Sequence, residues 1–211
     1  MHFRVRKFYM DGLSNQLLEP KMKTRKLALL IVLAATCLGL QLLPRPPNVE
    51  FTSFLSFIVG LMEGVVVGVF FGGFVMLVNG FLSPWGFGGL NIPFQMVGMA
   101  VAGVFGGFYR RFTRDVSFSA RFCLETAVLG ALIALIYDVV TNVGFGVQLM
   151  LSGMDPTVAL FTSIAYGSFF SLLHVLSNSV VFGALFLPLT NALSSLKVGD
   201  LNWLRRERLC S

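Results

Sequence analysis

Long apolar stretches constrain this chain more than any other feature of its sequence. Five can be placed, and they cover residues 27–43, 51–82, 92–109, 122–140 and 158–189. A run of about 20 apolar residues is what crosses the hydrocarbon core of a bilayer. Only 12% of the residues are charged, against about 25% in soluble domains, and the mean hydropathy is +0.79. The sequence therefore predicts an all-α integral membrane protein that lies in a lipid bilayer.

Two of these runs have an ambiguous length. Residues 51–82 and residues 158–189 each make 32 positions, which as a single helix would measure about 48 Å. That length is too great for one crossing and somewhat short for two. The apolar pattern alone does not decide how often each run crosses the membrane.

The positions of the basic residues resolve the ambiguity, because short cytoplasmic loops accumulate Lys and Arg. Fifteen of the 16 Lys and Arg residues form three clusters, and only Arg45 lies elsewhere. The clusters are Arg4, Arg6, Lys7, Lys21, Lys23, Arg25 and Lys26; Arg110, Arg111, Arg114 and Arg121; and Lys197, Arg205, Arg206 and Arg208. All three lie on one side of the membrane only if residues 51–82 cross twice and residues 158–189 cross once.

We therefore expect six transmembrane helices with both termini in the cytoplasm of a multi-pass cell-membrane protein. A tight turn near Gly60, Glu63 and Gly64 would divide the run at 51–82. The run at 158–189 would begin as a segment that dips into the protein from outside before the last helix, since irregular backbone is tolerated there when protein surrounds it. The expected organisation is a cytoplasmic segment at 1–25, a six-helix domain at 26–192 and a basic cytoplasmic tail at 193–211.

Several function classes are excluded by the sequence. The net charge of +6 comes from residues that flank apolar runs, which indicates membrane flanks and not nucleic-acid binding. Cys37, Cys123 and Cys210 have no disulfide-like or metal-like spacing. We find no phosphate-binding loop, zinc-binding helix motif or nucleophile elbow. The sequence predicts no catalytic residues, metal or cofactor, and Met22 is an alternative start to Met1.

With this topology, the connections at 44–50, 83–91 and 141–157 face outward, and polar side chains suited to small-molecule binding gather near them. The candidate binding residues are Trp85, Asn91, Gln95, Tyr137, Asp138, Thr141, Asn142, His174 and Asn178. An ionisable residue near a membrane span is costly and is a functional candidate by default. The alternatives are that Asp138 caps a loop or meets interfacial water, and that His174 is a hydrogen-bonded packing residue.

Small residues recur every four positions at Gly60, Gly64, Gly68 and Gly72, and again at Gly98, Ala102 and Gly106. Such stripes let helix backbones approach closely. They predict either packing inside the protein or a docking surface for another membrane subunit. A looser stripe of Ala28, Ala35 and Gly39 lies on the first helix.

In their order and placement, several segments resemble the substrate-binding S components of energy-coupling-factor (ECF) vitamin transporters. The resemblance covers about residues 25–192. It rests on PRPPNVEF after the first helix, the glycine-spaced third helix, GFGGLNIPFQMVGMAVAG, LIYDVVTNVGFG and HVLSNSVVFGALFLP. It implies a six-helix protein that captures a vitamin or related micronutrient from outside.

The resemblance also implies a membrane T component and two cytoplasmic ATPase subunits, which would hydrolyse ATP. In that family an alanine stripe on the first helix docks the T component, which points here to Ala28, Val32, Ala35 and Gly39. Cobalamin-type compounds, pantothenate and queuosine precursors are the first substrates to test. Two other classes remain open: a structural membrane scaffold, and an intramembrane enzyme that uses His174 and Asp138 as an acid/base pair.

Overall fold

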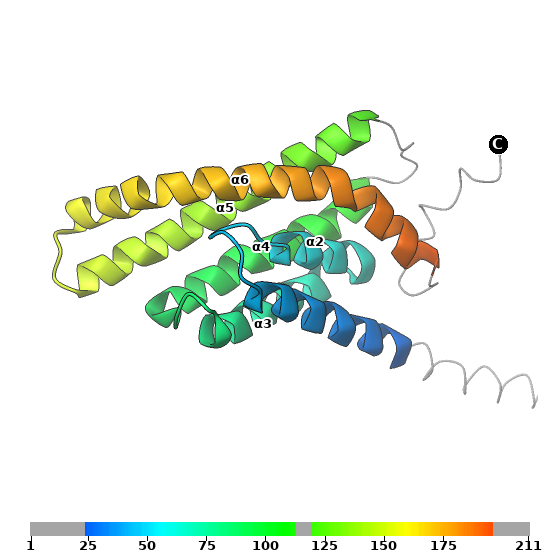
Figure 1. Cartoon of the computed structure of the whole chain (residues 1–211), viewed down its shortest axis with the longest axis horizontal. Helices are drawn as coiled ribbons and strands as arrows, with labels where there is room; N and C mark the ends of the chain where they lie inside the picture. Colours follow the sequence, from blue (N-terminus) through cyan, green and yellow to red (C-terminus); the bar gives the residue numbers. More distant parts are fainter. Residues whose placement is uncertain (1–23, 113–119, 196–211) are drawn as a thin grey trace, which may run out of the picture.

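A computed structural model describes residues 24–112 and 120–195, and their regular structure is helical (Figure 1). In chain order, the elements are an N-terminal helix Thr24–Leu42, α2 Thr52–Glu63, α3 Val65–Leu82, the short 3-10 helix η1 Gly89–Asn91, α4 Ile92–Phe112, α5 Ala120–Leu151 and α6 Pro156–Ser195. Five helices are long and apolar enough to cross a membrane, and α2 is a shorter apolar helix. These findings confirm the all-α class and are those expected of a multi-pass membrane protein.

The short helix α2 forms the centre of the bundle. Every residue from Thr52 to Met62 is buried, because other helices surround α2. Its 12 residues measure only about 18 Å, so the start of α2 lies well inside the bundle. The rings of Phe54 and Phe57 pack edge-on against Phe182 of α6 at 5.1 Å and 5.3 Å between centroids. The core therefore holds the first turn of α2 in a fixed place.

The run at 51–82 is divided into two helices, as the basic clusters predict. Gly64 ends α2 and begins α3 with φ of 96°, a backbone conformation that favours glycine. Its N–H donates to the carbonyl of Gly60 at 2.8 Å. A one-residue hinge is therefore sufficient to reverse the chain between α2 and α3.

The glycine stripes pack inside the protein. A Cβ at Gly60 would lie 2.1 Å from the carbonyl oxygen of Gly103, and one at Gly106 would lie 2.0 Å from that of Phe57. Gly68 and Gly72 likewise face the backbone of α4. Of the two interpretations of these stripes, the structure supports close packing of α2, α3 and α4.

The outward connection expected at 141–157 is wrong. Helix α5 continues to Leu151, and only residues 152–155 join it to α6. Gly144 and Gly146 lie inside the helix and allow close packing: a Cβ at Gly144 would lie 2.3 Å from Asn91 Oδ1, and Gly146 faces Leu160. The actual turn has Gly153 at φ of 97°, and Asp155 Oδ1 accepts backbone N–H groups at the start of α6.

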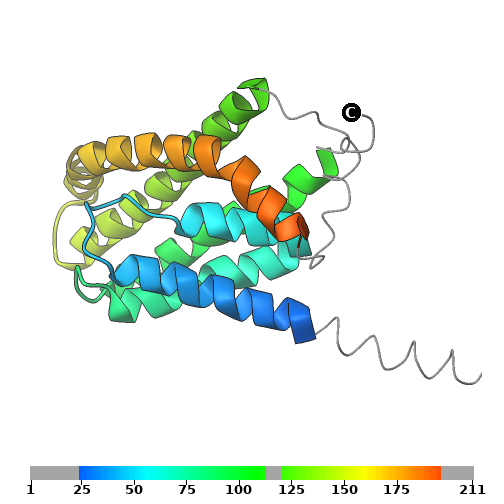
Figure 2. The same ribbon diagram turned by 45° about the vertical axis from the view of Figure 1, so that its right-hand side comes forward.

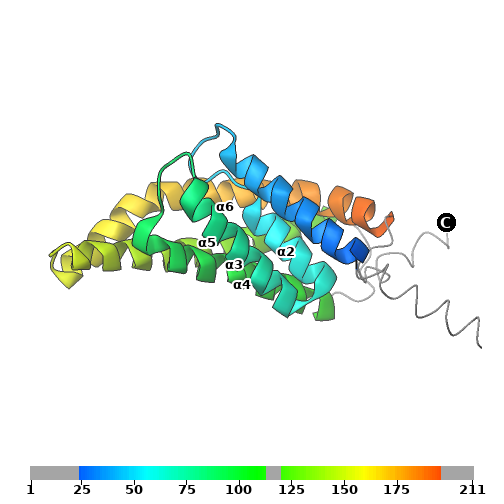
Figure 3. The same cartoon turned by 90° about the horizontal axis from the view of Figure 1, so that it is seen from below.

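The expected dipping segment before the last helix is also wrong. Helix α6 runs without interruption for 40 residues and passes through His174 and Asn178. It remains one helix because α5 extends alongside it and packs against it (Figures 1 and 3). Figure 2 shows a bend in the last third of α6, where Pro188 lies inside the helix and leaves one backbone carbonyl without its usual donor.

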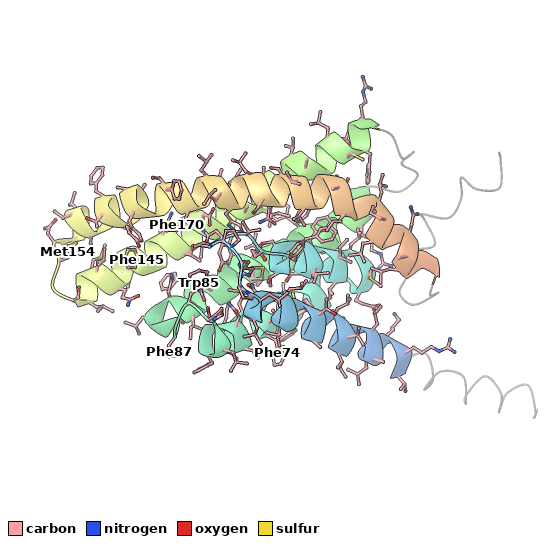
Figure 4. The ribbon with its side chains drawn as sticks, viewed as in Figure 1. Phe74, Trp85, Phe87, Phe145, Met154 and Phe170 are labelled. Carbon is pink, nitrogen blue, oxygen red and sulfur yellow. The ribbon has the colours of Figure 1, made fainter. Side chains whose placement is uncertain are left out.

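The helices alternate in direction, so residues 24 and 195 lie at the same end of the bundle (Figure 1). Lys26 and Glu63 meet there at 3.0 Å, and Arg110 Nη1 donates to the carbonyl of Met62. At the opposite end the α5–α6 hairpin extends beyond the other connections (Figures 1 and 3), with Met154 in its turn (Figure 4). Most of the segments expected at 1–25 and 193–211 lie outside the described residues.

Candidate functional site

Glu50 stands immediately before the first turn of α2 and caps it. One carboxylate oxygen accepts the backbone N–H groups of Thr52 and Ser53, the latter at 2.9 Å. A carboxylate is favoured at this position because the free N–H groups of a helix N-terminus carry partial positive charge. Since α2 begins inside the bundle, Glu50 is buried, with 7% of its surface exposed.

His174 joins this carboxylate to a second one. Its Nε2 lies 3.1 Å from Glu50 Oε1, and its Nδ1 lies 2.8 Å from Asp138 Oδ1. Asn178, one turn further along α6, donates Nδ2 to Glu50 Oε1 at 3.3 Å. The loop before α2, helix α5 and helix α6 thus meet in one buried hydrogen-bond network.

Both nitrogens of His174 face carboxylate oxygens, and each contact needs a proton. The cluster of Glu50, His174 and Asp138 therefore holds two protons in these contacts and carries one net negative charge. The backbone N–H groups of Thr52 and Ser53 and the amide of Asn178 donate to Glu50, and the imidazole of His174 faces it, and all of these contacts favour the charged form. Glu50 is thus maintained as a carboxylate by the groups around it.

A cavity of about 470 Å³ adjoins this cluster, since Glu50 and His174 both line it. This volume falls within the range of about 300–1,000 Å³ that is usual for small-molecule sites. Its lining residues come from every long helix and from the loops after the N-terminal helix and α3. They are Gln41, Arg45, Pro47, Asn48, Glu50, Met76, Asn79, Ser83, Trp85, Gln95, Met99, Tyr137, Tyr166, Phe170 and His174.

The cavity has a buried floor and an aromatic rim. Met76, Met99 and His174 are almost fully buried, whereas Trp85 and Tyr166 are mostly exposed. Trp85 and Phe170, labelled in Figure 4, come from the loop after α3 and from α6. A site with several aromatic walls and a few polar groups at its base is suited to a small organic molecule.

Of the candidate residues taken from the sequence, Trp85, Gln95, Tyr137 and His174 line this cavity. The ring of Tyr137 packs edge-on against that of His174, with 5.4 Å between centroids. Asp138 and Asn178 do not line the cavity, but each contacts a residue that does. Asp138 contacts His174, and Asn178 donates to Glu50. These candidates therefore belong to one site, either as lining residues or as support.

The remaining candidates do not line this cavity. Thr141 donates its hydroxyl to backbone carbonyls of its own helix, the nearer at 3.1 Å. Asn91 packs against Gly144, and Asn142 packs against Gly167 on α6. Asp138 and Asn142 also line a second, mostly apolar cavity of about 360 Å³ between α5 and α6. These amides serve mainly the contact between helices.

Several lining residues were not among the candidates. Glu50 and Arg45 carried detectable signals, because Glu50 is a lone carboxylate next to an apolar run and Arg45 is the one basic residue outside the clusters. Gln41 and Asn79 are isolated polar residues within apolar helices. Tyr166 and Phe170 carried no such signal, because their contribution depends on the unexpected continuation of α5 and α6.

The site has no arrangement typical of a metal centre. Among residues 24–112 and 120–195, no group of three or more His, Cys, Asp or Glu side chains is placed to hold a metal ion. Comparisons of the chain with protein-family models, with curated proteins and with solved structures give no match.

Proposed function

We propose that this protein is the substrate-capture subunit of an ECF-type importer. It binds a vitamin or related micronutrient from outside the cell and delivers it to a membrane T component driven by two cytoplasmic ATPases. It crosses the cell membrane six times, with α2 and its preceding loop making the short second crossing, and has both termini in the cytoplasm.

One observation carries this proposal: the cavity of about 470 Å³ lies at the end of the bundle opposite the basic residues. The described members of the basic clusters at the ends of the N-terminal helix, α4 and α5 share the other end (Figure 1). Because basic residues mark the cytoplasmic side, the cavity opens outward. An outward cavity with a closed, buried floor is what a capture subunit requires.

The face of the N-terminal helix that carries Ala28, Val32, Ala35 and Gly39 is exposed, and Leu33 and Cys37 on its other side are buried. A Cβ at Gly39 would meet no atom within 4 Å among the described residues. Small side chains on an open helix face allow another helix to approach closely. We assign this face to the T component.

The direct test is a thermal-shift screen of the purified protein against vitamins and nucleobase-like micronutrients. A ligand at a hundredfold excess over its Kd stabilises the folded state by about 2.7 kcal/mol. We expect one compound class to raise the unfolding temperature and the T component to co-purify when co-expressed. The absence of both results would contradict the proposal and favour a structural scaffold.

Variants connect any such shift to the cavity. Gln95→Ala should weaken binding, since Gln95 lines the cavity. Phe74→Ala is the matched control because Phe74, labelled in Figure 4, lies exposed on α3 and is not a lining residue. Equal affinities for the two variants would place the ligand elsewhere.

A further inference from the structure

We infer that the cavity takes an anionic, planar aromatic molecule and that Arg45 holds its carboxylate or phosphate group. This inference deepens the proposed function and rests on it. It concerns the chemistry of the ligand and not the transport partners. Arg45 is the one basic residue that departs from the charge pattern of the chain.

Arg45 lies at the opposite end of the bundle from the basic residues at the helix ends. Fifteen of the 16 Lys and Arg residues fall in the three clusters, and Arg45 alone lies in the loop after the N-terminal helix. A basic residue on the outer side runs against the charge bias of membrane proteins. Arg45 lines the cavity, and a role in ligand binding there accounts for a basic residue on the outer side.

The loop around Arg45 holds the guanidinium in place. Arg45 Nη1 donates to the carbonyl of Val49 at 2.6 Å, and the N–H of Val49 donates to the carbonyl of Pro46 at 3.3 Å. Asn48 adopts a left-handed conformation with φ of 61°. Because prolines flank Arg45 and fix the backbone, little ordering is needed when a ligand binds.

Glu50 is the nearest candidate partner for Arg45, yet its oxygens are already occupied. They accept from Thr52, Ser53, His174 and Asn178, and a carboxylate offers about four lone-pair sites. Across the described residues no carboxylate forms an ion pair with Arg45. Its Nε is shielded from solvent and has no hydrogen-bond partner in the part of the chain that the structure describes.

Because its Nε lacks a partner within residues 24–112 and 120–195, the Arg45 guanidinium is suited to a hydrogen-bond acceptor on a ligand in the cavity. Arg binds carboxylate and phosphate through two parallel N–H groups. Arg45 is half-buried, so an anionic group on the ligand would supply the acceptor that its Nε lacks within the described part of the chain. The charge of Arg45 therefore selects ligands with a negative group.

The rest of the wall favours a planar ring. Trp85, Tyr166 and Phe170 present aromatic faces or edges to the cavity, and Tyr137 lies at its base. The amide oxygens of Gln41 and Gln95 are shielded from solvent and have no hydrogen-bond donor in the described part of the chain. An aromatic ring with N–H groups on its edge would stack on these walls and supply the missing donors.

The test measures binding of matched compound pairs to the purified full-length protein by isothermal titration calorimetry. One arm compares heteroaromatic acids with their primary amides, using pyridine-3-carboxylate and pterin-6-carboxylate. The other arm compares heteroaromatic phosphate esters with their free alcohols, using pyridoxine 5′-phosphate. We expect the charged member of at least one pair to bind at least tenfold more tightly, and the arm in which this occurs identifies the anionic group.

Substitutions then assign the preference to Arg45. Arg45→Gln should abolish the difference within the pair, whereas Arg45→Lys should retain part of it. Arg25→Gln is the control, because it removes the same charge from an exposed position at the far end of the N-terminal helix, which leads to the loop that holds Arg45. A preference that survives Arg45→Gln would overturn the role of Arg45.

The comparison within pairs needs no variant, so it decides the inference even if a substitution prevents folding. If no charged member binds more tightly than its neutral partner, the inference is wrong. If a neutral or cationic micronutrient nevertheless raises the unfolding temperature, the inference about the anionic ligand fails but the proposed capture function stands. Both the inference and the proposed function would be wrong only if no ligand shifted the unfolding temperature and no T component co-purified.

Discussion

At the scale of single residues, His174 is the side chain on which the buried network depends. It separates the carboxylates of Glu50 and Asp138 and contacts both, at 3.1 Å and 2.8 Å. The other oxygen of Asp138, Oδ2, has no hydrogen-bond partner among the described residues. The imidazole is therefore the group that keeps two buried carboxylates compatible with each other.

Replacing His174 by Ala should destabilise the protein strongly. Removing one member of a buried ionic pair typically costs about 3–5 kcal/mol, because the remaining charge stays buried without compensation. The free energy of unfolding can be measured by titrating SDS into the protein in a mild detergent. A loss below about 1 kcal/mol, which is within the usual range for ordinary substitutions, would contradict this role.

A rescue experiment separates charge from packing. Adding Glu50→Gln and Asp138→Asn to the His174→Ala protein removes both carboxylate charges and keeps nearly the same shapes. We expect the triple variant to recover part of the lost stability. If the triple variant is less stable than His174→Ala alone, the cost arises from lost packing and not from buried charge.

At the scale of elements, the fold depends on the close approach of α2, α3 and α4. Gly60 and Gly103 meet with no room for a side chain, since a Cβ at Gly60 would lie 2.1 Å from the Gly103 carbonyl oxygen. A helix backbone cannot yield as a flexible side chain would. The position of α2, and with it that of Glu50, is therefore set by backbone contact.

Gly60→Ala should move α2 away from α4 and reduce stability by about 1–3 kcal/mol, the usual cost of overpacking. Gly39→Ala is the matched control in the isolated protein, because it makes the same change on an exposed helix face where a Cβ would meet no atom of residues 24–112 and 120–195 within 4 Å. Unfolding in SDS titrations measures both variants. Equal stabilities would show that the α2–α4 contact adapts easily.

At the scale of the whole molecule, the proposed orientation predicts which ends of the bundle are reachable from outside the cell. Ser152 is exposed in the α5–α6 turn, and Arg25 is exposed at the opposite end of the bundle. In a protein with Cys37, Cys123 and Cys210 replaced, we expect a membrane-impermeant maleimide to label Ser152→Cys in intact cells. Arg25→Cys should react only after the cells are opened, and the reverse pattern would invert the proposed orientation.

Much of the fold could be predicted from the sequence, because apolar runs and basic clusters report on membrane crossing through simple solvation energies. The division of residues 51–82 at Gly64 was predicted in this way. The errors occurred where residues serve tertiary contacts. Residues 141–151 were expected in an outward connection, but they belong to α5, where Gly144 and Gly146 allow close packing against neighbouring helices.

The sequence by itself determined the all-α class with helices apolar enough to cross a membrane, the division of residues 51–82 into two helices and part of the candidate site, including Trp85, Gln95, Tyr137 and His174. These features follow from local composition, which fixes solvation and backbone preference. Only the tertiary structure decided that Glu50 caps α2 beneath the cavity, that His174 joins it to Asp138, and that Arg45, Tyr166 and Phe170 complete the wall. Those contacts join residues as far as 124 positions apart, and such distances are set by how whole helices pack.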